Sequence, residues 1–367
     1  MAELDGVALA ELLKNVQSGE PGVQELLAHL AEQAGALAPI VNEGETDEDA
    51  VPAPPDEAKS QRGEVYRLGN HRLMCGDSAS AADVDMLLAG ARIHLVNTDP
   101  PYNVKVEPRS NNAIAAGLSS FPGDDLQQKK LLNKTCRMEG THSGLMHHQS
   151  FDVARQGTKS ATTEKLRPKD RPLANDFVSD ADFEKMLLAW FGNIARVLEP
   201  GRSWYIWGGY ANCGNYPPVL KECELYFSQA IIWVKEHPVL TRKDFMGNHE
   251  WCFYGWREGA GHEFFGPANA TDVWSVKKVN PASMIHLTEK PVELAVRAIG
   301  YSSRPGENVL DLFGGSGSTL IGCEKTGRRA FLMELDTLYC DVIRQRWAEF
   351  VHGQGCDWES LTPEAAE

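Results

Sequence analysis

The chain has 367 residues, 42% of them hydrophobic, and a formal net charge of -15, which suits one large α/β domain with appendages or two smaller domains. Its eight cysteines include no CxxC pair, so the composition argues against a disulfide framework or a zinc site and indicates a reducing cytosol. The sequence shows no signal peptide and no apolar run of about 18 residues, so we expect neither secretion nor membrane spanning.

The negative charge is distributed unevenly along the chain. Residues 1–60 hold thirteen acidic residues against two basic ones, a net charge of -11. Residues 104–172 hold twelve basic residues against seven acidic ones, a local charge of +5. This basic stretch is a modest electrostatic footprint for a nucleic-acid partner, which the overall charge alone would argue against.

Four segments are expected in the domain organisation. Apolar residues at helical spacing predict an N-terminal helical appendage over residues 1–41. The acidic and proline-rich residues 42–63 are typical of a linker. The main domain is predicted over residues 64–350, followed by a C-terminal tail over residues 351–367.

The main domain opens with a predicted hairpin over residues 66–74, and a helix is expected over residues 80–88. Asp77 lies between them, at the end of the second strand. A carboxylate in this position can accept a hydrogen bond from the adenine amine of a bound cofactor, or it can cap the helix.

The next expected strand covers residues 93–98 and turns polar where its carboxyl end leaves the sheet, which is where open α/β sheets place their chemistry. Asp99, Pro100, Pro101 and Tyr102 follow it directly. The two prolines fix φ and leave their carbonyls free to accept hydrogen bonds. A rigid group of acceptors beside an aromatic ring is suited to holding a planar amine whose nitrogen must become nucleophilic. A strand-ending turn capped by Asp99 is the simpler interpretation.

Residues 104–175 form a long basic insertion, far longer than an ordinary connection, and are expected to be a functional lid or a disordered segment. Beyond it, hydrophobic patterns predict helices over residues 180–198 and 215–223 and strands over residues 203–207 and 227–234. Residues 235–285 are expected to be irregular. Their aromatic and basic residues make them a candidate target-recognition region for nucleic acid, although aromatic residues that cover the sheet end would look the same.

A second motif lies near the C-terminus. Residues 309–313 read as a buried strand that contains Asp311 and Phe313, followed by a turn that contains Gly314, Gly315 and Gly317. Ser318 and Thr319 begin the next helix, whose free N–H groups can face a ligand. The strand over residues 329–335 then brings Glu334 to the position where this architecture binds ribose hydroxyls. Leu320 replaces the third glycine of a dinucleotide fingerprint, which disfavours a nicotinamide enzyme. Phe313 directly before the glycines, with Asp311 two residues earlier, suits a ligand with a cationic head and no pyrophosphate, such as S-adenosylmethionine.

Together, Asp-Pro-Pro-Tyr at residues 99–102 and Asp-Leu-Phe-Gly-Gly-Ser-Gly-Ser-Thr at residues 311–319 resemble the motifs of DNA amino-methyltransferases, which methylate adenine N6 or cytosine N4. The catalytic motif precedes the cofactor motif, as in the β group of that family, and the resemblance covers about residues 64–350. The insertion is similar to those of phage and prophage members.

The resemblance implies an α/β, Rossmann-like methyltransferase fold with a seven-stranded mixed sheet and helices on both faces. It implies S-adenosylmethionine as the cofactor and no metal. The implied catalytic residues are Asp99, Pro100, Pro101 and Tyr102. The implied cofactor-binding residues are Asp77, Thr288, Lys290, Asp311, Phe313, Gly314, Gly315, Gly317, Ser318, Thr319 and Glu334.

The resemblance also implies the substrate, a base in double-stranded DNA that must leave the helix to be methylated. An initial Asp in the catalytic motif favours adenine N6, because the cytosine members more often have Ser there. Cytosine N4 methylation and a cofactor-binding DNA-associated protein without catalysis remain as alternatives. The expected location is the cytoplasm, with a homodimer or a restriction endonuclease as further candidate partners.

Overall fold

The computed structural model describes residues 40–103, 178–239, 244–277 and 290–365. The expected N-terminal helices and the basic insertion lie outside the described residues. By its internal contacts the chain divides into two compact units, one made of residues 1–102 and 178–367 and the other of residues 103–177. The following description concerns the first unit.

The described part of the first unit is built on a nine-stranded mixed sheet in the order β1-β2-β9-β8-β3-β4-β6-β5-β7. Strands β2, β9, β8, β3 and β4 are parallel to one another. The pairs β1 with β2, β4 with β6 and β6 with β5 are antiparallel, and β7 pairs with β5 in parallel. The strands are β1 (Val65–Leu68), β2 (His71–Cys75), β3 (Leu95–Thr98), β4 (Ser203–Gly208), β5 (Leu225–Val239), β6 (Gly247–Arg257), β7 (Val273–Ser275), β8 (Asn308–Asp311) and β9 (Arg329–Glu334).

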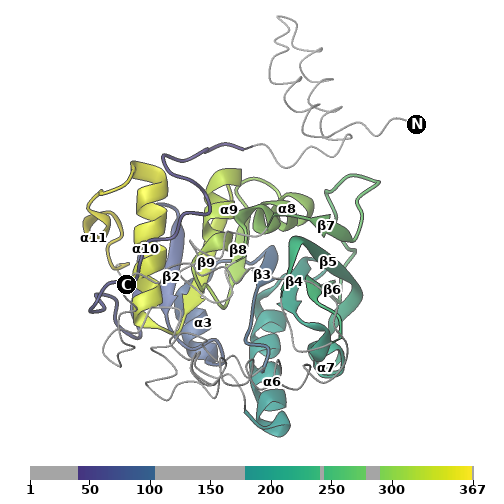
Figure 1. The fold of residues 1–367 in the computed structure, drawn as a ribbon. Coiled ribbons are helices and arrows are strands. Elements are labelled where there is room, and N and C mark those ends of the chain that lie inside the picture. Colours follow the sequence, from purple (N-terminus) through teal and green to yellow (C-terminus); the bar gives the residue numbers. More distant parts are fainter. Residues whose placement is uncertain (1–39, 104–177, 240–243, 278–289, 366–367) are drawn as a thin grey trace, which may run out of the picture. The chain divides into compact units, whose positions relative to one another are not determined.

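Helices cover both faces of this sheet, as the resemblance implies (Figure 1). One face carries α8 (Val292–Ser302), α9 (Ser318–Thr326) and α10 (Thr337–His352), and the other carries α3 (Ala81–Leu88), α6 (Asp180–Val197) and α7 (Tyr216–Glu222). Two short helices, the 3-10 helix η2 (Tyr210–Cys213) and α11 (Trp358–Leu361), complete the described helices. Within the described ranges, no helix combines the length and apolarity needed to cross a membrane.

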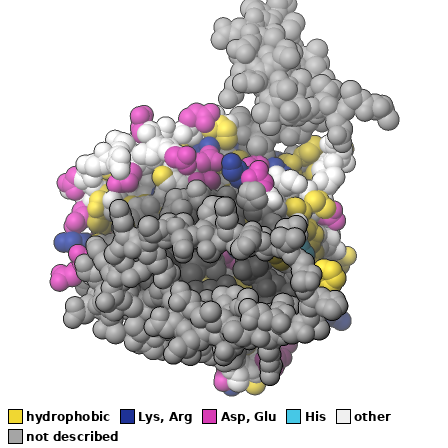
Figure 2. Space-filling view, viewed as in Figure 1, with side chains coloured by type: hydrophobic (Ala, Val, Ile, Leu, Met, Phe, Trp, Pro, Cys, Tyr) yellow, Lys and Arg dark blue, Asp and Glu magenta, His cyan; other side chains and the backbone are white. Residues whose placement is uncertain are grey.

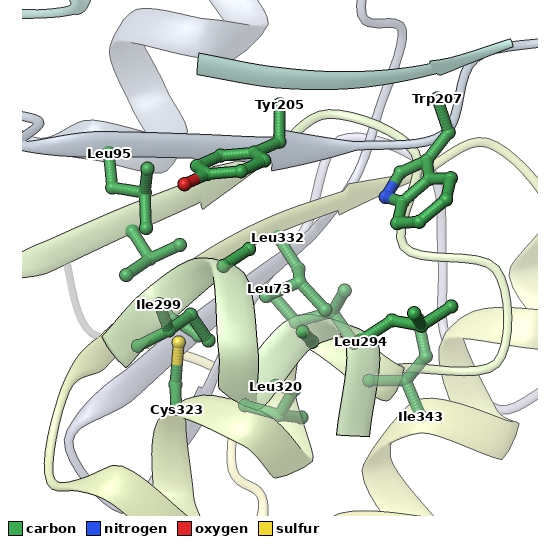
Figure 3. Packing of buried hydrophobic residues seen from close by; sticks show 14 of the residues in the cluster. Leu73, Leu95, Tyr205, Trp207, Leu294, Ile299, Leu320, Cys323, Leu332 and Ile343 are labelled. Carbon is green, nitrogen blue, oxygen red and sulfur yellow. The ribbon is translucent and has the colours of Figure 1, made fainter. Parts of the chain in front are cut away.

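Two hydrophobic layers form because successive side chains of a strand point to opposite faces. In β4, Tyr205 and Trp207 pack with α8, α9 and α10, whereas Trp204 and Ile206 pack with the helices of the other face. Figure 3 shows the first layer, in which Tyr205 and Trp207 lie over Leu294 and Leu332. The strands that carry the two motifs are thus buried from both sides, which fixes the positions of their carboxyl ends.

The expected number of seven strands was too low. All seven predicted strands exist, and the two additional ones, β6 and β7, both lie in the region that was expected to be irregular. The aromatic residues of β6 suggested nucleic-acid stacking, but such residues also favour strands. Gly255 interrupts the hydrophobic pattern of β6 because a Cβ there would lie 1.8 Å from the Tyr226 carbonyl oxygen of the neighbouring strand.

The segment over residues 42–63, expected to be a linker, is packed against the domain instead. It has no helix or strand, yet Val41 and Asn42 bond to α9, and the Asp49 carboxylate accepts a hydrogen bond of 2.9 Å from the first N–H of α8. Gly44 adopts φ of +75° against the Phe350 ring, which leaves no room for a Cβ. The acidic residues Glu48 and Asp49 therefore pair with Lys325 and with the start of α8, whereas composition alone does not distinguish such pairing from solvent exposure.

Ser60, near the end of this segment, belongs to a buried polar cluster. Its N–H and Oγ both donate to Asp341 Oδ1, at 2.9 and 2.6 Å, and Lys59 N donates to the other oxygen at 2.6 Å. We expect Ser60→Ala to lower the free energy of unfolding by about 1.5–3 kcal/mol, because the buried Asp341 carboxylate loses a donor. Urea denaturation measures this change, and a loss below about 0.5 kcal/mol, the range of surface substitutions, would contradict the assignment.

The C-terminal residues, expected to be a tail, also belong to the fold. The helix α10 continues to His352, and residues 363–365 bond to the outer side of β1 through Arg67 N to Pro363 O (2.9 Å) and Ala365 N to Val65 O (2.7 Å). They therefore cover an edge that would otherwise expose unpaired backbone groups.

Candidate active site

The two motifs meet at the carboxyl ends of adjacent strands. The parallel strands β3 and β8 are paired through Leu95 with Val309 and Val96 with Leu310. Asp99 follows β3 directly, and Asp311 ends β8. The Thr98 hydroxyl joins the two ends, since it donates to Asp311 Oδ1 at 2.8 Å and accepts from Leu312 N at 3.1 Å. Segments more than two hundred residues apart in the sequence thus form one site.

The Asp99 carboxylate has a donor on each oxygen. The Tyr102 hydroxyl donates to Oδ1 at 2.7 Å, and the Lys290 ammonium donates to Oδ2 and contacts the Tyr102 hydroxyl at 3.1 Å. Pro100 is buried, and the Tyr102 carbonyl accepts from Asn212 Nδ2 at 3.3 Å. Burial raises the pKa of the Asp99 carboxyl above its usual range, whereas the Lys290 charge acts to lower it.

The glycine-rich turn lies between β8 and α9. Gly315 and Gly317 adopt positive φ values of +53° and +89°, which favour glycine. Gly314 approaches α10 so closely that a Cβ would lie 2.9 Å from Ile343 Cδ1, whereas the nearest atom to a Cβ on Gly315 would be 3.9 Å away. The turn is therefore held tightly on one side and has room at Gly315.

Glu334 binds this turn from the end of β9. Its Oε2 accepts from Gly315 N at 2.8 Å and its Oε1 accepts from Asp336 N at 2.9 Å. Burial raises the pKa of Glu334 to about 7, and burial likewise raises the pKa of Asp311 to about 7. Two carboxyl groups that burial keeps from ionising fully are thus placed beside a turn with backbone room for a ligand.

The remaining predicted cofactor residues lie in different surroundings. Ser318 and Thr319 begin α9, and Thr319 Oγ1 accepts from Asn97 Nδ2 at 3.0 Å. The half-buried Phe313 ring meets Trp190 edge to face, with centroids 4.9 Å apart. Asp77 is exposed, and its Oδ1 accepts from Ala79 N at 2.9 Å in a turn before α3, whose N-cap is Ser80.

Asp77 nevertheless lies at the same sheet edge as Glu334, because Cys75 of β2 is the register partner of Glu334. Thr288 lies outside the described residues. The hydrogen bonds of the Lys290 ammonium in the structure are to Asp99 and Tyr102, not to the glycine turn. The cofactor roles of these three residues stay predictions.

Several polar residues of the site were not identified from the sequence. Asn97 links three elements, because its amide nitrogen donates to Thr319 and its amide oxygen accepts from Trp207 Nε1 at 3.3 Å. Glu250 of β6 contacts Lys290 at 3.5 Å. The polar residues Asn97 and Thr98 in a buried strand were a visible signal, whereas nothing in the sequence near Glu250 indicates that it reaches this site.

The candidate target-recognition region divides into buried and exposed aromatic residues. Phe253, Tyr254 and Trp274 belong to the core. Phe245 and Phe264 are exposed, Phe245 by 88%. The simpler interpretation, aromatic residues that cover the sheet, therefore applies to part of the region, and its role in binding nucleic acid stays a prediction.

The parallel strands β2, β9, β8, β3 and β4 carry a glycine-rich turn after β8, an acidic residue at the end of β9 and a polar motif after β3. This arrangement defines a Rossmann-like, cofactor-dependent α/β protein. Residues 93–345, more than half of the chain, match the family model for the N6 and N4 methyltransferases, described as DNA methylase. The chain belongs to this DNA methylase family.

Curated relatives support the same family. The Type II methyltransferase M.HinfI of Haemophilus influenzae is 25% identical over 194 residues, which cover 48% of this chain and 53% of the relative. The Type II methyltransferase M.BglII of Bacillus subtilis is 23% identical over 190 residues, which cover 41% and 52%. The chain thus spans about half the length of the curated relatives it matches.

A solved structure supports the fold. The PvuII DNA methyltransferase, described as cytosine-N4-specific, superposes with a TM-score of 0.51 and 12% identity, covering 82% of this chain and 94% of that one. This similarity confirms the Rossmann-like methyltransferase fold that the sequence predicts.

Proposed function

We propose that this protein is an S-adenosylmethionine-dependent DNA methyltransferase that methylates the exocyclic N6 amine of adenine. The observation that carries the proposal is the position of the Asp99 carboxylate beside the Asp311 end of β8 and its glycine-rich turn. Membership of the DNA methylase family and the likeness to two Type II methyltransferases support it.

The residues at the glycine-rich turn fit the proposed cofactor. The room at Gly315 lets a ligand approach the backbone, and the Glu334 carboxylate has lone pairs left to accept from ribose hydroxyls. Buried carboxyl groups such as Asp311 suit a ligand with a cationic sulfonium and amino group. When bound, S-adenosylmethionine supplies an electrophilic methyl group. Phe313, Ser318, Thr319, Asp77 and Thr288 complete the proposed binding set.

The catalytic side of the site acts on the target base. A base stacked in a duplex cannot enter such a site, so it must rotate out at a cost of a few kcal/mol, which stacking on Tyr102 partly offsets. The Asp99 carboxylate and the Pro100 carbonyl accept hydrogen bonds from the amine, which orients its nitrogen and makes the lone pair more available. The Asp99 carboxylate can also take up the proton that the amine releases.

The distribution of charge bears on how DNA would bind. On the face shown in Figure 2, acidic side chains of the described residues gather along the upper edge, with basic side chains among them. Such a surface repels phosphates, so we assign the contacts with DNA to the basic residues 104–172, with their local charge of +5, and to the region 235–285. A cytoplasmic location, a homodimer, a restriction endonuclease partner and a phage or prophage origin stay predictions.

Methylation of mixed-sequence duplex DNA by the full chain tests the proposal. We expect N6-methyladenine in the hydrolysed nucleosides, measured by mass spectrometry, at sites that sequencing then maps. N4-methylcytosine in its place would contradict adenine specificity and leave the family assignment intact. Cofactor binding without any methylated base would support the non-catalytic alternative.

A further inference from the structure

Four charged side chains form a series of alternating sign that ends on Asp99. Lys235 of β5 donates to Glu250 Oε1 of β6. The other oxygen of Glu250 lies 3.5 Å from the Lys290 ammonium, which in turn donates to Asp99 Oδ2. We call these residues the charged series. It connects Asp99 with two strands that contribute no residue to either sequence motif.

The two lysines of the series are buried. Their side chains are 6% and 8% exposed, whereas about a quarter of each carboxylate side chain is accessible. The Lys290 ammonium also lies 5.2 Å from the centre of the Trp207 ring and 5.6 Å from that of Tyr102. A buried ammonium is costly unless it is paired, and aromatic faces add to the pairing. Such an arrangement holds Lys290 in one place and keeps it charged.

The pKa directions agree with this geometry. Burial, the largest influence, acts to lower the pKa of Lys290, but Asp99 and Glu250 more than offset it, and the pKa is raised. Burial acts to raise the pKa of Glu250, but Lys290 and Lys235 more than offset it, and the pKa is lowered. Lys290 and Glu250 thus stabilise each other's charge.

We propose that Lys290 and Glu250 are positioning residues for methyl transfer: Glu250 holds the Lys290 ammonium against Asp99, and the ammonium keeps the Asp99 carboxylate fixed and charged. This inference rests on the proposed function. It differs from the resemblance, which implies a cofactor contact for Lys290. Among the described residues, the ionisable groups around Asp99 are Lys290, Tyr102, Glu250, Asp311 and Cys252, and Lys235 contacts Glu250.

The test measures single-turnover methyl transfer at saturating DNA and cofactor between pH 6 and 9, together with cofactor affinity by calorimetry. We expect Lys290→Met to lower the rate at pH 7 about 10- to 100-fold, as removal of a supporting partner commonly does. The rate should recover as pH rises, because Asp99 without the ammonium ionises at a higher pH. Cofactor affinity should change less than about twofold.

Further variants separate charge from folding. Lys290→Arg keeps the positive charge, so it should retain the wild-type pH profile at a reduced rate. Glu250→Gln should lower the rate with unchanged cofactor affinity, and Glu250→Asp should restore part of it. Lys325→Met, which removes a buried lysine paired with Glu48 outside the charged series, is the matched control and should keep the wild-type pH profile.

Weakened cofactor binding by Lys290→Met without a change in pH profile would overturn the proposal in favour of a cofactor contact. A Lys290→Met variant with the wild-type rate would overturn it as well. A pH titration of the Asp99 carboxyl by carbon-13 NMR, assigned by its loss in Asp99→Asn, needs no activity. It should give a higher pKa in Lys290→Met than in the wild type even if the proposed function fails, and equal values would reject the inference.

Discussion

Replacing Asp99 with asparagine is expected to lower the rate of methyl transfer about 10²- to 10³-fold, the range seen when one preorganised polar partner of a reacting group is removed. Asparagine has nearly the shape of aspartate but lacks the negative charge that strengthens the hydrogen bond from the target amine and lets the carboxylate accept its proton. The Lys290 ammonium keeps Glu250 as a partner, so the variant should remain folded. Single-turnover transfer of a tritiated methyl group to DNA measures the effect.

Cofactor affinity decides how that result is interpreted. Asp99→Asn should bind S-adenosylmethionine within about twofold of the wild type, because none of the proposed cofactor residues belongs to β3 or to the Asp99 motif. Asp85→Asn, which changes an exposed carboxylate paired with Arg196, is the matched control and should transfer methyl groups normally. A folded Asp99→Asn protein that no longer binds cofactor would contradict the assignment of roles.

Replacing Glu334 with glutamine is expected to weaken cofactor binding about 10- to 100-fold, because a hydrogen bond to a charged group contributes about 1.5–3 kcal/mol. The backbone N–H groups of Gly315 and Asp336 would lose their carboxylate acceptor at the same time. The measured quantity is the Kd from calorimetric titration. An unchanged Kd in the folded variant would show that Glu334 does not contact the cofactor.

The same carboxyl group predicts how cofactor binding depends on pH. Burial raises the pKa of Glu334 to about 7, and hydroxyl donors favour the ionised form. Wild-type affinity for S-adenosylmethionine should therefore increase from pH 6 to pH 8. In Glu334→Gln the increase should be smaller, because the contribution from ionisation of Glu334 is absent. Asp311, whose pKa burial also raises to about 7, accounts for the rest, so Asp311→Asn should reduce the slope further.

The stability of the protein without cofactor should depend on pH in the opposite direction. The pKa of Glu334 is higher in the folded chain than its ordinary value of about 4.3, so the folded state holds the proton more tightly than the unfolded one. The stabilisation is present below the ordinary pKa and is lost as pH rises through about 7. Thermal unfolding at pH 5 and pH 8 with and without Glu334→Gln measures it.

The strands that carry the motifs were predictable because they are buried from both sides and read as short hydrophobic runs. Val309 and Leu310 before Asp311, and Leu95 and Val96 before Asn97, follow this pattern closely. The strand β6 was missed because glycine and charged residues interrupt its pattern. Gly255 is required because the Tyr226 backbone leaves no room for a side chain, and Glu250 forms an ion pair with Lys290. Neither partner is close in the sequence.

The site residues likewise fall into those that the sequence predicted and those that it did not. Asp99, the glycine turn and Glu334 could be identified because each stands in a local motif whose backbone geometry the sequence dictates. Glu250 and Lys235 could not, because their involvement depends on the register between β5 and β6, in which Trp233 is paired with Glu250. The packing of the segment over residues 42–63 was not predicted for a related reason, since the Ser60 donors to Asp341 come from 281 residues away.

The pairing of β2 with β9 and of β3 with β8 also has a consequence for how the molecule is made. A ribosome releases β1, β2 and β3 long before the strands that must lie between β2 and β3 have been synthesised. Contacts between such distant parts of a chain form slowly, because closing long loops costs entropy before any pairing compensates. The early hairpin therefore spends most of translation with an unpaired edge, so production of this protein should depend strongly on chaperones that shield nascent strands.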